Sequence, residues 1–153
     1  MEDLSRILNQ HQFFDTLDQD CLDLIVGCAR NVVFRKDEYL VREGDEENDF
    51  YLLRDGRVAI EIDVNFQSRV VVTVEPGEIL GWSWLLPPYQ WAYSARALTM
   101  TRALALDGKC LRRKCEENHS LGYELLKRFA VDIEERLHKS WLQVGDMYAP
   151  VKS

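Results

Sequence analysis

A segment of twelve residues, from position 82 to 93, carries the densest cluster of side chains suited to binding chemistry. Its five large aromatic residues are Trp82, Trp84, Tyr89, Trp91 and Tyr93. Aromatic walls with a few polar groups are typical of small-molecule sites, and exposed tryptophan and tyrosine often anchor protein interfaces. The same side chains can instead fill a core and pack one element against another. The sequence leaves these three interpretations open.

The four cysteines lack the spacing of a metal or redox site. Cys21 and Cys28 lie seven residues apart, and Cys110 and Cys115 lie five apart, so neither pair matches C-x2-C. The three histidines, at positions 11, 119 and 138, are scattered along the chain. We therefore expect buried structural thiols and no metal site.

Catalytic motifs are equally lacking. The sequence contains no G-x-S-x-G, no P-loop and no H-E-x-x-H. The acidic residues of 43–49 fall where a surface turn is expected, and divalent-ion binding is the minor alternative there. We therefore expect a protein that is not an enzyme and has no catalytic residues.

Composition favours a soluble globular domain without a nucleic-acid partner. The chain has 153 residues, 46% hydrophobic and 29% charged, and a net charge of −7. Residues 1–63 hold 16 acidic and 7 basic side chains, and no basic tail offsets them. No apolar run approaches the roughly 20 residues of a membrane span, and the N-terminus lacks the features of a secretory signal. We expect a cytoplasmic protein that binds neither DNA nor membrane.

The elements that would position the aromatic segment are mostly strands. Val58, Ile60, Ile62 and Val64 alternate with smaller or polar residues, which is typical of a half-buried strand. Turn signals at Gly44, 55–56 and 76–77 separate short apolar runs, and residues 93–107 are predicted as strand. Short N-terminal helices precede this part, with Asp18 as a helix N-cap. The pattern predicts a mainly β jelly-roll or barrel.

The last third is predicted to be helical, with a long helix over about 120–143. Leu121, Leu125 and Phe129 form an i, i+4 ridge that can pack on the barrel. A second set of residues steps along the helix at heptad a/d spacing. This seam consists of Leu126, Ala130, Ile133, Leu137, Ser140 and Val144. Two separate apolar faces predict that the seam contacts another helix, so we expect a homodimer.

These elements and their turns resemble the cyclic-nucleotide-binding domain of the catabolite-activator and fumarate–nitrate-regulator superfamily. The resemblance covers roughly residues 8–142 and rests on four segments, at 42–45 (REGD), 50–58 (FYLLRDGRV), 76–81 (PGEILG) and 93–97 (YSARA). It implies a double-stranded β-helix barrel over about 30–107 and a C-terminal helical part over about 108–145. We expect these parts to form one domain, residues 1–153, without a helix-turn-helix domain.

The resemblance also implies a phosphate-binding cassette, which this sequence alters. By resemblance, the cassette comprises Gly81, Trp82, Ser83, Trp84, Tyr93, Ser94, Ala95 and Arg96. Trp82 stands where the family has the glutamate for the ribose hydroxyl, and Tyr93 stands where it has the arginine for the phosphate. Strand alternation predicts that Arg96 points to the opposite face from Tyr93.

The expected function is therefore a non-catalytic, dimeric sensor or regulatory module that does not bind cyclic nucleotide in the usual way. No cofactor is expected. Two alternatives stay open: a genuine cyclic AMP- or cyclic GMP-binding protein with a rearranged cassette, and a docking scaffold whose pocket is self-filled. The ligand or protein partner is not identified by the sequence. Iron–sulfur or haem ligation, used by some sensors of similar fold, is the minor alternative for the cysteines.

Overall fold

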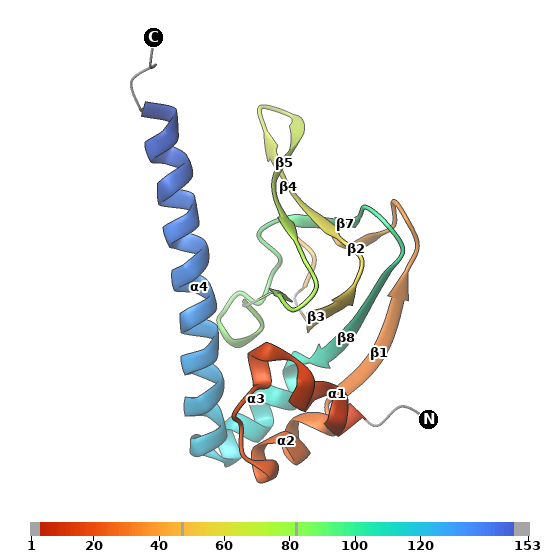
Figure 1. Cartoon of the computed structure of the whole chain (residues 1–153), viewed down its shortest axis with the longest axis vertical. Coiled ribbons are helices and arrows are strands. Elements are labelled where there is room, and N and C mark those ends of the chain that lie inside the picture. The colour runs from red at the N-terminus through yellow and green to blue at the C-terminus, as the bar shows by residue number, and fades with distance from the viewer. Residues whose placement is uncertain (1–3, 47, 82, 149–153) are drawn as a thin grey trace.

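The computed structural model describes residues 4–46, 48–81 and 83–148. In this part of the chain, eight strands form two four-stranded antiparallel sheets (Figure 1). The first sheet has the order β1 (Ala29–Phe34), β8 (Thr101–Asp107), β3 (Asp49–Asp55) and β6 (Ile79–Leu80). The second has the order β2 (Tyr39–Val41), β7 (Ser94–Ala97), β4 (Val58–Val64) and β5 (Gln67–Val74). The predicted mainly β jelly roll with flanking helices is confirmed.

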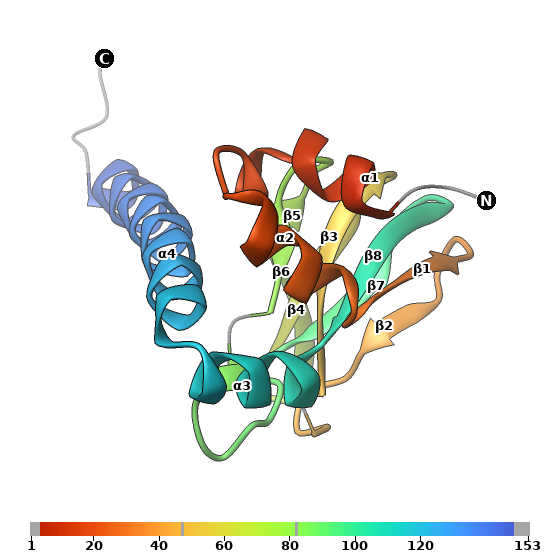
Figure 2. The same cartoon turned by 90° about the horizontal axis from the view of Figure 1, so that it is seen from below.

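The helices lie outside this barrel, and three of them gather at one end of it (Figure 2). They are α1 (Leu4–Gln10), η1 (Gln12–Phe14), α2 (Gln19–Val26), η2 (Ser83–Leu85), α3 (Gly108–Glu117) and α4 (His119–Tyr148). The predicted cap at Asp18 is confirmed, because its carboxylate accepts from the Cys21 backbone N–H at 2.8 Å. Asp107 caps α3 in the same way, accepting from the backbone N–H groups of Lys109 and Cys110.

The single strand predicted over 93–107 is wrong: the structure divides it between the two sheets. Ala95 in β7 pairs with Ile60 of the second sheet, whereas Ala105 in β8 pairs with Tyr51 of the first. The chain turns between them, where the Thr101 hydroxyl donates to the Thr99 carbonyl at 3.0 Å. An alternating pattern continues through such a corner, so periodicity alone did not reveal it.

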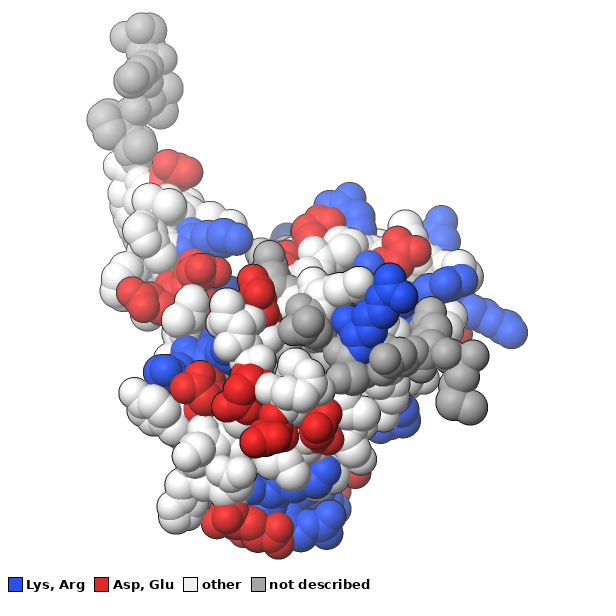
Figure 3. Space-filling view, turned by 60° about the horizontal axis from the view of Figure 1, so that its bottom comes forward, with Lys and Arg blue, Asp and Glu red and all other residues white. Residues whose placement is uncertain are grey.

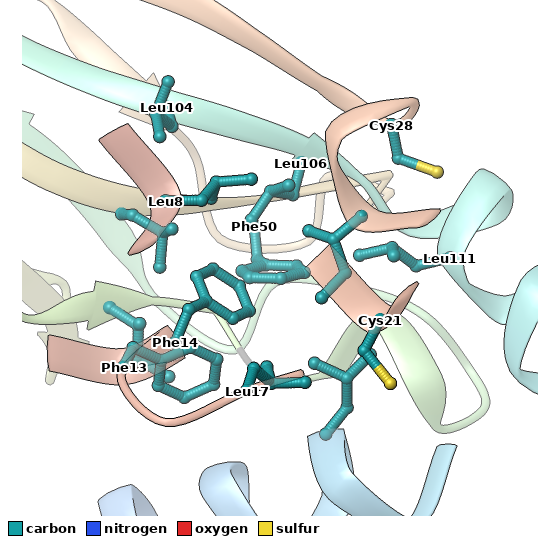
Figure 4. Packing of buried hydrophobic residues seen from close by; sticks show 14 of the residues in the cluster. Leu8, Phe13, Phe14, Leu17, Cys21, Cys28, Phe50, Leu104, Leu106 and Leu111 are labelled. Atoms are coloured by element: carbon teal, nitrogen blue, oxygen red, sulfur yellow. The ribbon is translucent and has the colours of Figure 1, made fainter. Parts of the chain in front are cut away.

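Two hydrophobic cores share the first sheet, because successive side chains of β3 and β8 alternate between its faces. Outside the barrel lies the helical core (Figure 4), made of Leu8, Phe13, Phe14, Leu17, Cys21, Leu22, Ile25, Cys28, Phe50, Leu52, Ile79, Trp84, Leu104, Leu106, Leu111, Leu121, Leu125 and Phe129. Inside lies the barrel core, made of Val41, Tyr51, Leu53, Val58, Ile60, Val74, Leu80, Trp91, Tyr93, Ala95, Ala103 and Ala105.

Helix α4 uses one face for the helical core and leaves the seam partly exposed. The predicted ridge is confirmed, since Leu121, Leu125 and Phe129 are the residues that α4 buries. Arg128 adds polar anchors by donating to the carbonyls of Phe13 and Asp15 at 3.0 and 2.7 Å. Helix α4 begins beside α3 at the helical end of the barrel, and its C-terminal half extends away from that end, toward the side on which the β4–β5 hairpin projects (Figure 1).

The prediction of free structural thiols is wrong for two of the four cysteines. Cys28 and Cys110 form a disulfide, with a Cα–Cα distance of 5.8 Å. They meet because Cys28 precedes β1, Cys110 follows β8 and these strands pair antiparallel, with Ala29 opposite Leu106. Cys21 and Cys115 stay as thiols. Burial and the neighbouring Asp18 raise the pKa of Cys21 to about 11, so this thiol is a poor nucleophile.

Candidate functional site: the aromatic segment and the flank of helix α4

The end of the aromatic segment lies inside the barrel. Trp91 is 3% exposed and Tyr93 is 8% exposed. The Trp91 ring lies 6.3 Å from the Tyr51 ring and 5.6 Å from the Tyr93 ring, measured between centroids. Backbone hydrogen bonds of 2.8 Å join Trp91 N–H to the Asp45 carbonyl and Gly44 N–H to the Trp91 carbonyl. These bonds fix the tryptophan at the place where the loop enters the barrel.

Gly81 allows the tryptophan to enter. Its φ is +99°, and a Cβ added there would lie 2.6 Å from Cη2 of Trp91 and 3.3 Å from the Phe50 Cβ. Only glycine fits both the left-handed backbone and this close approach. The glycine that the resemblance assigns to the cassette therefore contacts the chain's own tryptophan.

Alanines provide the space that the large rings occupy. Ala95, Ala103 and Ala105 come from β7 and β8 and are buried in the barrel core beside Trp91 and Tyr93. Protein interiors are close-packed, so small side chains on the wall match bulky ones in the middle. The barrel interior is thus largely occupied by side chains of the protein itself.

The two other cassette residues on β7 belong to the outer face of the sheet. Arg96 forms ion pairs with Asp37 at 3.0 Å and with the nearly buried carboxylate of Glu61 at 3.3 Å. The Ser94 hydroxyl accepts from the Glu43 backbone N–H at 2.9 Å. Glu61 also raises the pKa of Tyr39, because the phenol hydrogen-bonds to its carboxylate. Arg96 is therefore held on the face opposite to Tyr93, in agreement with strand alternation.

Trp84 enters the other core. It is 1% exposed, and its ring stacks on Phe50 with centroids 5.1 Å apart and lies 5.6 Å from the Phe129 ring. The segment from Gly81 to Tyr93 thus supplies Trp91 to the barrel core and Trp84 to the contact with α4. Trp82, the remaining tryptophan of the segment, lies outside the described residues.

Six of the eight residues assigned to the cassette are divided among three places. Gly81, Tyr93 and Ala95 border the barrel core, Trp84 lies in the helical core, and Ser94 and Arg96 lie on the outer sheet face. Ser83 lies in η2. Sequence reasoning missed Tyr51, which stacks on Trp91. Its position in the Phe50–Leu53 run hid the alternation, because both faces of β3 are buried.

Cavities lie along α4, and one of about 720 Å³ has a charged lining. In this lining Lys127 pairs with Glu124 at 3.2 Å, and Asp132 pairs at 3.0 Å with Arg136, which lies outside the lining. Burial raises the pKa of Asp132, and the Arg136 charge opposes that change. Arg136 also donates to the Ile79 carbonyl and so ties α4 to β6.

The described residues were also compared with the requirements of a metal site and of a membrane-spanning helix. Within 4–46, 48–81 and 83–148, no three histidine, cysteine or acidic side chains gather as a metal site. None of the helices described there is long and apolar enough to cross a membrane. On the face shown in Figure 3, acidic and basic side chains are interspersed, without a continuous basic field.

The comparisons with known proteins agree with this fold. A crystal structure of a Geobacter metallireducens protein, assigned to the cyclic nucleotide-binding proteins, is 29% identical and has a TM-score of 0.80. The match covers 90% of this chain and all of that one. The cAMP-dependent protein kinase regulatory subunit of Eremothecium gossypii is 28% identical over 113 residues, which are 74% of this chain and 24% of the relative.

Mouse cGMP-dependent protein kinase 2 is 27% identical over 82 residues. This match takes in 52% of the chain but only 11% of the kinase, so the chain corresponds to a small part of that protein. The family model for the cyclic nucleotide-binding domain matches residues 31–118, from β1 to the end of α3. This chain belongs to the cyclic nucleotide-binding domain family.

Proposed function

We propose that the chain is a single, non-catalytic regulatory domain that acts as a cytoplasmic homodimer and does not bind cyclic nucleotide in the usual way. The observation that carries the proposal is the occupation of the barrel core by Trp91 and Tyr93. A ligand that entered the barrel would first have to displace two buried aromatic rings. Each ring has close contacts on several sides that the ligand would need to replace.

The barrel core also lacks the positive charge that a cyclic phosphate needs, which supports the same proposal. A phosphate taken into a concave site needs charge-assisted hydrogen bonds, worth about 1.5–3 kcal/mol each. The side chain at position 93 is a phenol rather than a guanidinium. Arg96, the nearest replacement, faces away from the barrel core and is engaged by Asp37 and Glu61.

The dimer is proposed from the seam of α4, whose apolar side chains stay partly exposed although Leu126, Ala130 and Ile133 border a small cavity beside Trp84. Four of its apolar side chains are between 38% and 52% exposed: Leu126, Ile133, Leu137 and Val144. Ala130 is also exposed and leaves room for close approach of a second helix. A second copy of α4 would bury this stripe, and rearrangement of the helix pair would carry a regulatory signal.

Cyclic AMP or cyclic GMP binding is the second candidate, and the relatives favour it. Two of them are a cGMP-dependent protein kinase and the regulatory subunit of a cAMP-dependent protein kinase. Under this candidate the loop that carries Trp91 would move out of the barrel. A docking scaffold with a permanently filled barrel is the third candidate.

Titration calorimetry with cyclic AMP and cyclic GMP, each up to about 1 mM, separates these candidates. We expect no heat of binding from either nucleotide. The variant Tyr93→Arg, which restores the guanidinium, serves as a probe for the obstruction by Trp91, and we expect it to stay inactive until Trp91→Ala is added. Micromolar binding by the unaltered protein would contradict the proposal and favour the second candidate.

The dimer is tested by the double variant Ile133→Asp and Leu137→Asp, which places charge in the seam. Light scattering should report a dimer for the unaltered protein and a monomer for the variant. Val131→Asp, on an exposed side of α4 outside the seam, is the matched control and should remain dimeric. An unchanged mass for the double variant would show that another surface joins the copies.

A further inference from the structure

A groove on the flank of α4 lies between the aromatic segment and the α3–α4 corner, and we call it the α3–α4 groove. It measures about 420 Å³, and six of the residues that line it are Trp84, Leu85, Tyr89, Arg112, Leu126 and Phe129. A smaller cavity of about 160 Å³ adjoins it, since Trp84, Leu85, Leu126 and Phe129 line both. Sites for small molecules typically measure about 300–1,000 Å³.

Arg112 carries a charge that lies outside the ion pairs of the described residues. Its guanidinium donates to the Trp84 carbonyl and lies over the Tyr89 ring, 4.2 Å from the centroid. The ion pairs of the described residues do not include it. The rest of the lining is mostly apolar, with Glu116 and His119 as further ionisable residues. A half-buried cation on such a wall favours an anion beside it, because the apolar surroundings weaken solvent screening.

Trp84 provides a second unused group. Its indole Nε1 is buried and has no hydrogen-bond acceptor among the described residues. A buried N–H without an acceptor costs about 1–3 kcal/mol, so such groups usually mark a missing partner. Because this nitrogen has almost no accessible surface, the indole could donate to a ligand oxygen only after its ring shifted toward the groove.

We propose that the α3–α4 groove binds an amphipathic carboxylate, whose acyl chain or ring lies on the apolar wall and whose carboxylate pairs with Arg112. The inference rests on the proposed regulatory function, for which it names the ligand class. Leu126 belongs both to the groove and to the dimer seam, so an occupant would contact the helix pair directly. Phosphate-rich or sugar-rich ligands fit less well, because most of the wall is aromatic or aliphatic.

The test is titration of the full chain with decanoate and, separately, with 1-decanol, which has the same chain but no charge. We expect decanoate to bind and to raise the melting temperature. Arg112→Met should weaken decanoate binding by about tenfold or more and leave decanol binding nearly unchanged. Arg112→Lys keeps the positive charge and should recover part of the loss. Arg113→Met, an exposed neighbour on α3, is the matched control and should bind as the unaltered protein does.

Three results would overturn the inference. The first is no decanoate binding up to about 1 mM by a protein that light scattering shows to be dimeric, a result that leaves the proposed function standing. The second is an equal loss for Arg112→Met and Arg113→Met, which would indicate non-specific attraction. The third is binding only by the Ile133→Asp and Leu137→Asp monomer, which would mean that a second copy fills the groove. Melting curves of each variant confirm that it is folded.

Discussion

The barrel core and the helical core lie on opposite sides of the same sheet, yet they are made of different kinds of residues. Strand β8 contributes Ala103 and Ala105 to the barrel core and Leu104 and Leu106 to the helical core. The aromatic segment then adds one tryptophan to each. In the barrel core, Trp91 occupies a space lined by small residues. In the helical core, Trp84 packs among leucines and connects the barrel to α4.

This difference predicts different effects on stability when each tryptophan is replaced by alanine. Trp84→Ala should lower the free energy of unfolding by about 3–5 kcal/mol, since it removes a fully buried indole between Phe50 and Phe129. It should also loosen α4, which would exchange its amide hydrogens faster. Trp91→Ala should cost a similar or smaller amount and leave the protection of α4 unchanged. Chemical denaturation and hydrogen exchange measure the two effects.

If the amide hydrogens of α4 lost protection equally in both variants, the two tryptophans would not differ in how they support α4. A sharper form of the test adds indole to each variant. The alanine-lined space left by Trp91 should accept indole and recover stability, as a cavity inside a formed barrel does. The space left by Trp84 should collapse as α4 shifts, and recover less.

The disulfide lies in the helical core, where it joins the residue that precedes β1 to α3. Reduction, or Cys110→Ser, should lower the free energy of unfolding by about 2–4 kcal/mol, since the closed loop spans 82 residues in sequence. Melting with and without reductant measures the effect. Cys115→Ser is the matched control, because that cysteine is free. An equal change in both variants would indicate lost packing rather than a lost cross-link. In a reducing cytosol the pair would be dithiol, so the reduced value is the relevant one there.

The sequence predicted correctly the features that depend on residues close together in the chain, and it missed those that depend on distant residues. The cap at Asp18 and the buried ridge of α4 depend on residues within one or two helical turns, and both were predicted. The Cys28–Cys110 pair, the corner between β7 and β8 and the separate fates of Trp84 and Trp91 depend on which strands pair. Nothing local distinguishes a tryptophan on one side of a sheet from a tryptophan on the other.

Substitutions at two glycines can separate backbone strain at a positive φ from steric contact with the Trp91 ring. Gly81→Ala adds a Cβ 2.6 Å from the Trp91 ring at a φ of +99°, and should cost about 1–3 kcal/mol. Gly44→Ala has almost the same φ, +91°, but meets no atom within 4 Å, so it should show only the backbone strain. Urea denaturation of both variants gives the difference. Equal values would mean that Trp91 moves freely away from position 81.

The smallest expected effect is a change with pH in the free energy of unfolding, and it depends on His11 at the helical end of the molecule. Burial lowers the pKa of His11, whose Nδ1 accepts from the Phe13 backbone N–H at 3.2 Å. The unfolded chain therefore binds a proton more readily than the folded one below the ordinary pKa of about 6.5. The stability that depends on neutral His11 is fully present above that pH and is lost as the pH falls through the lowered folded value.

The slope for one such group cannot exceed about 1.4 kcal/mol per pH unit. His11→Asn keeps an acceptor near the Phe13 N–H but cannot take up the proton, so its stability should change less between pH 7.5 and 5. His138→Asn, at an exposed position on α4, is the control for a histidine outside both cores. If the protein and His11→Asn lose stability in parallel on acidification, carboxylates cause the loss and the buried imidazole does not. A flatter profile for His11→Asn alone would identify protonation of the buried imidazole as a cause of the loss of stability in acid.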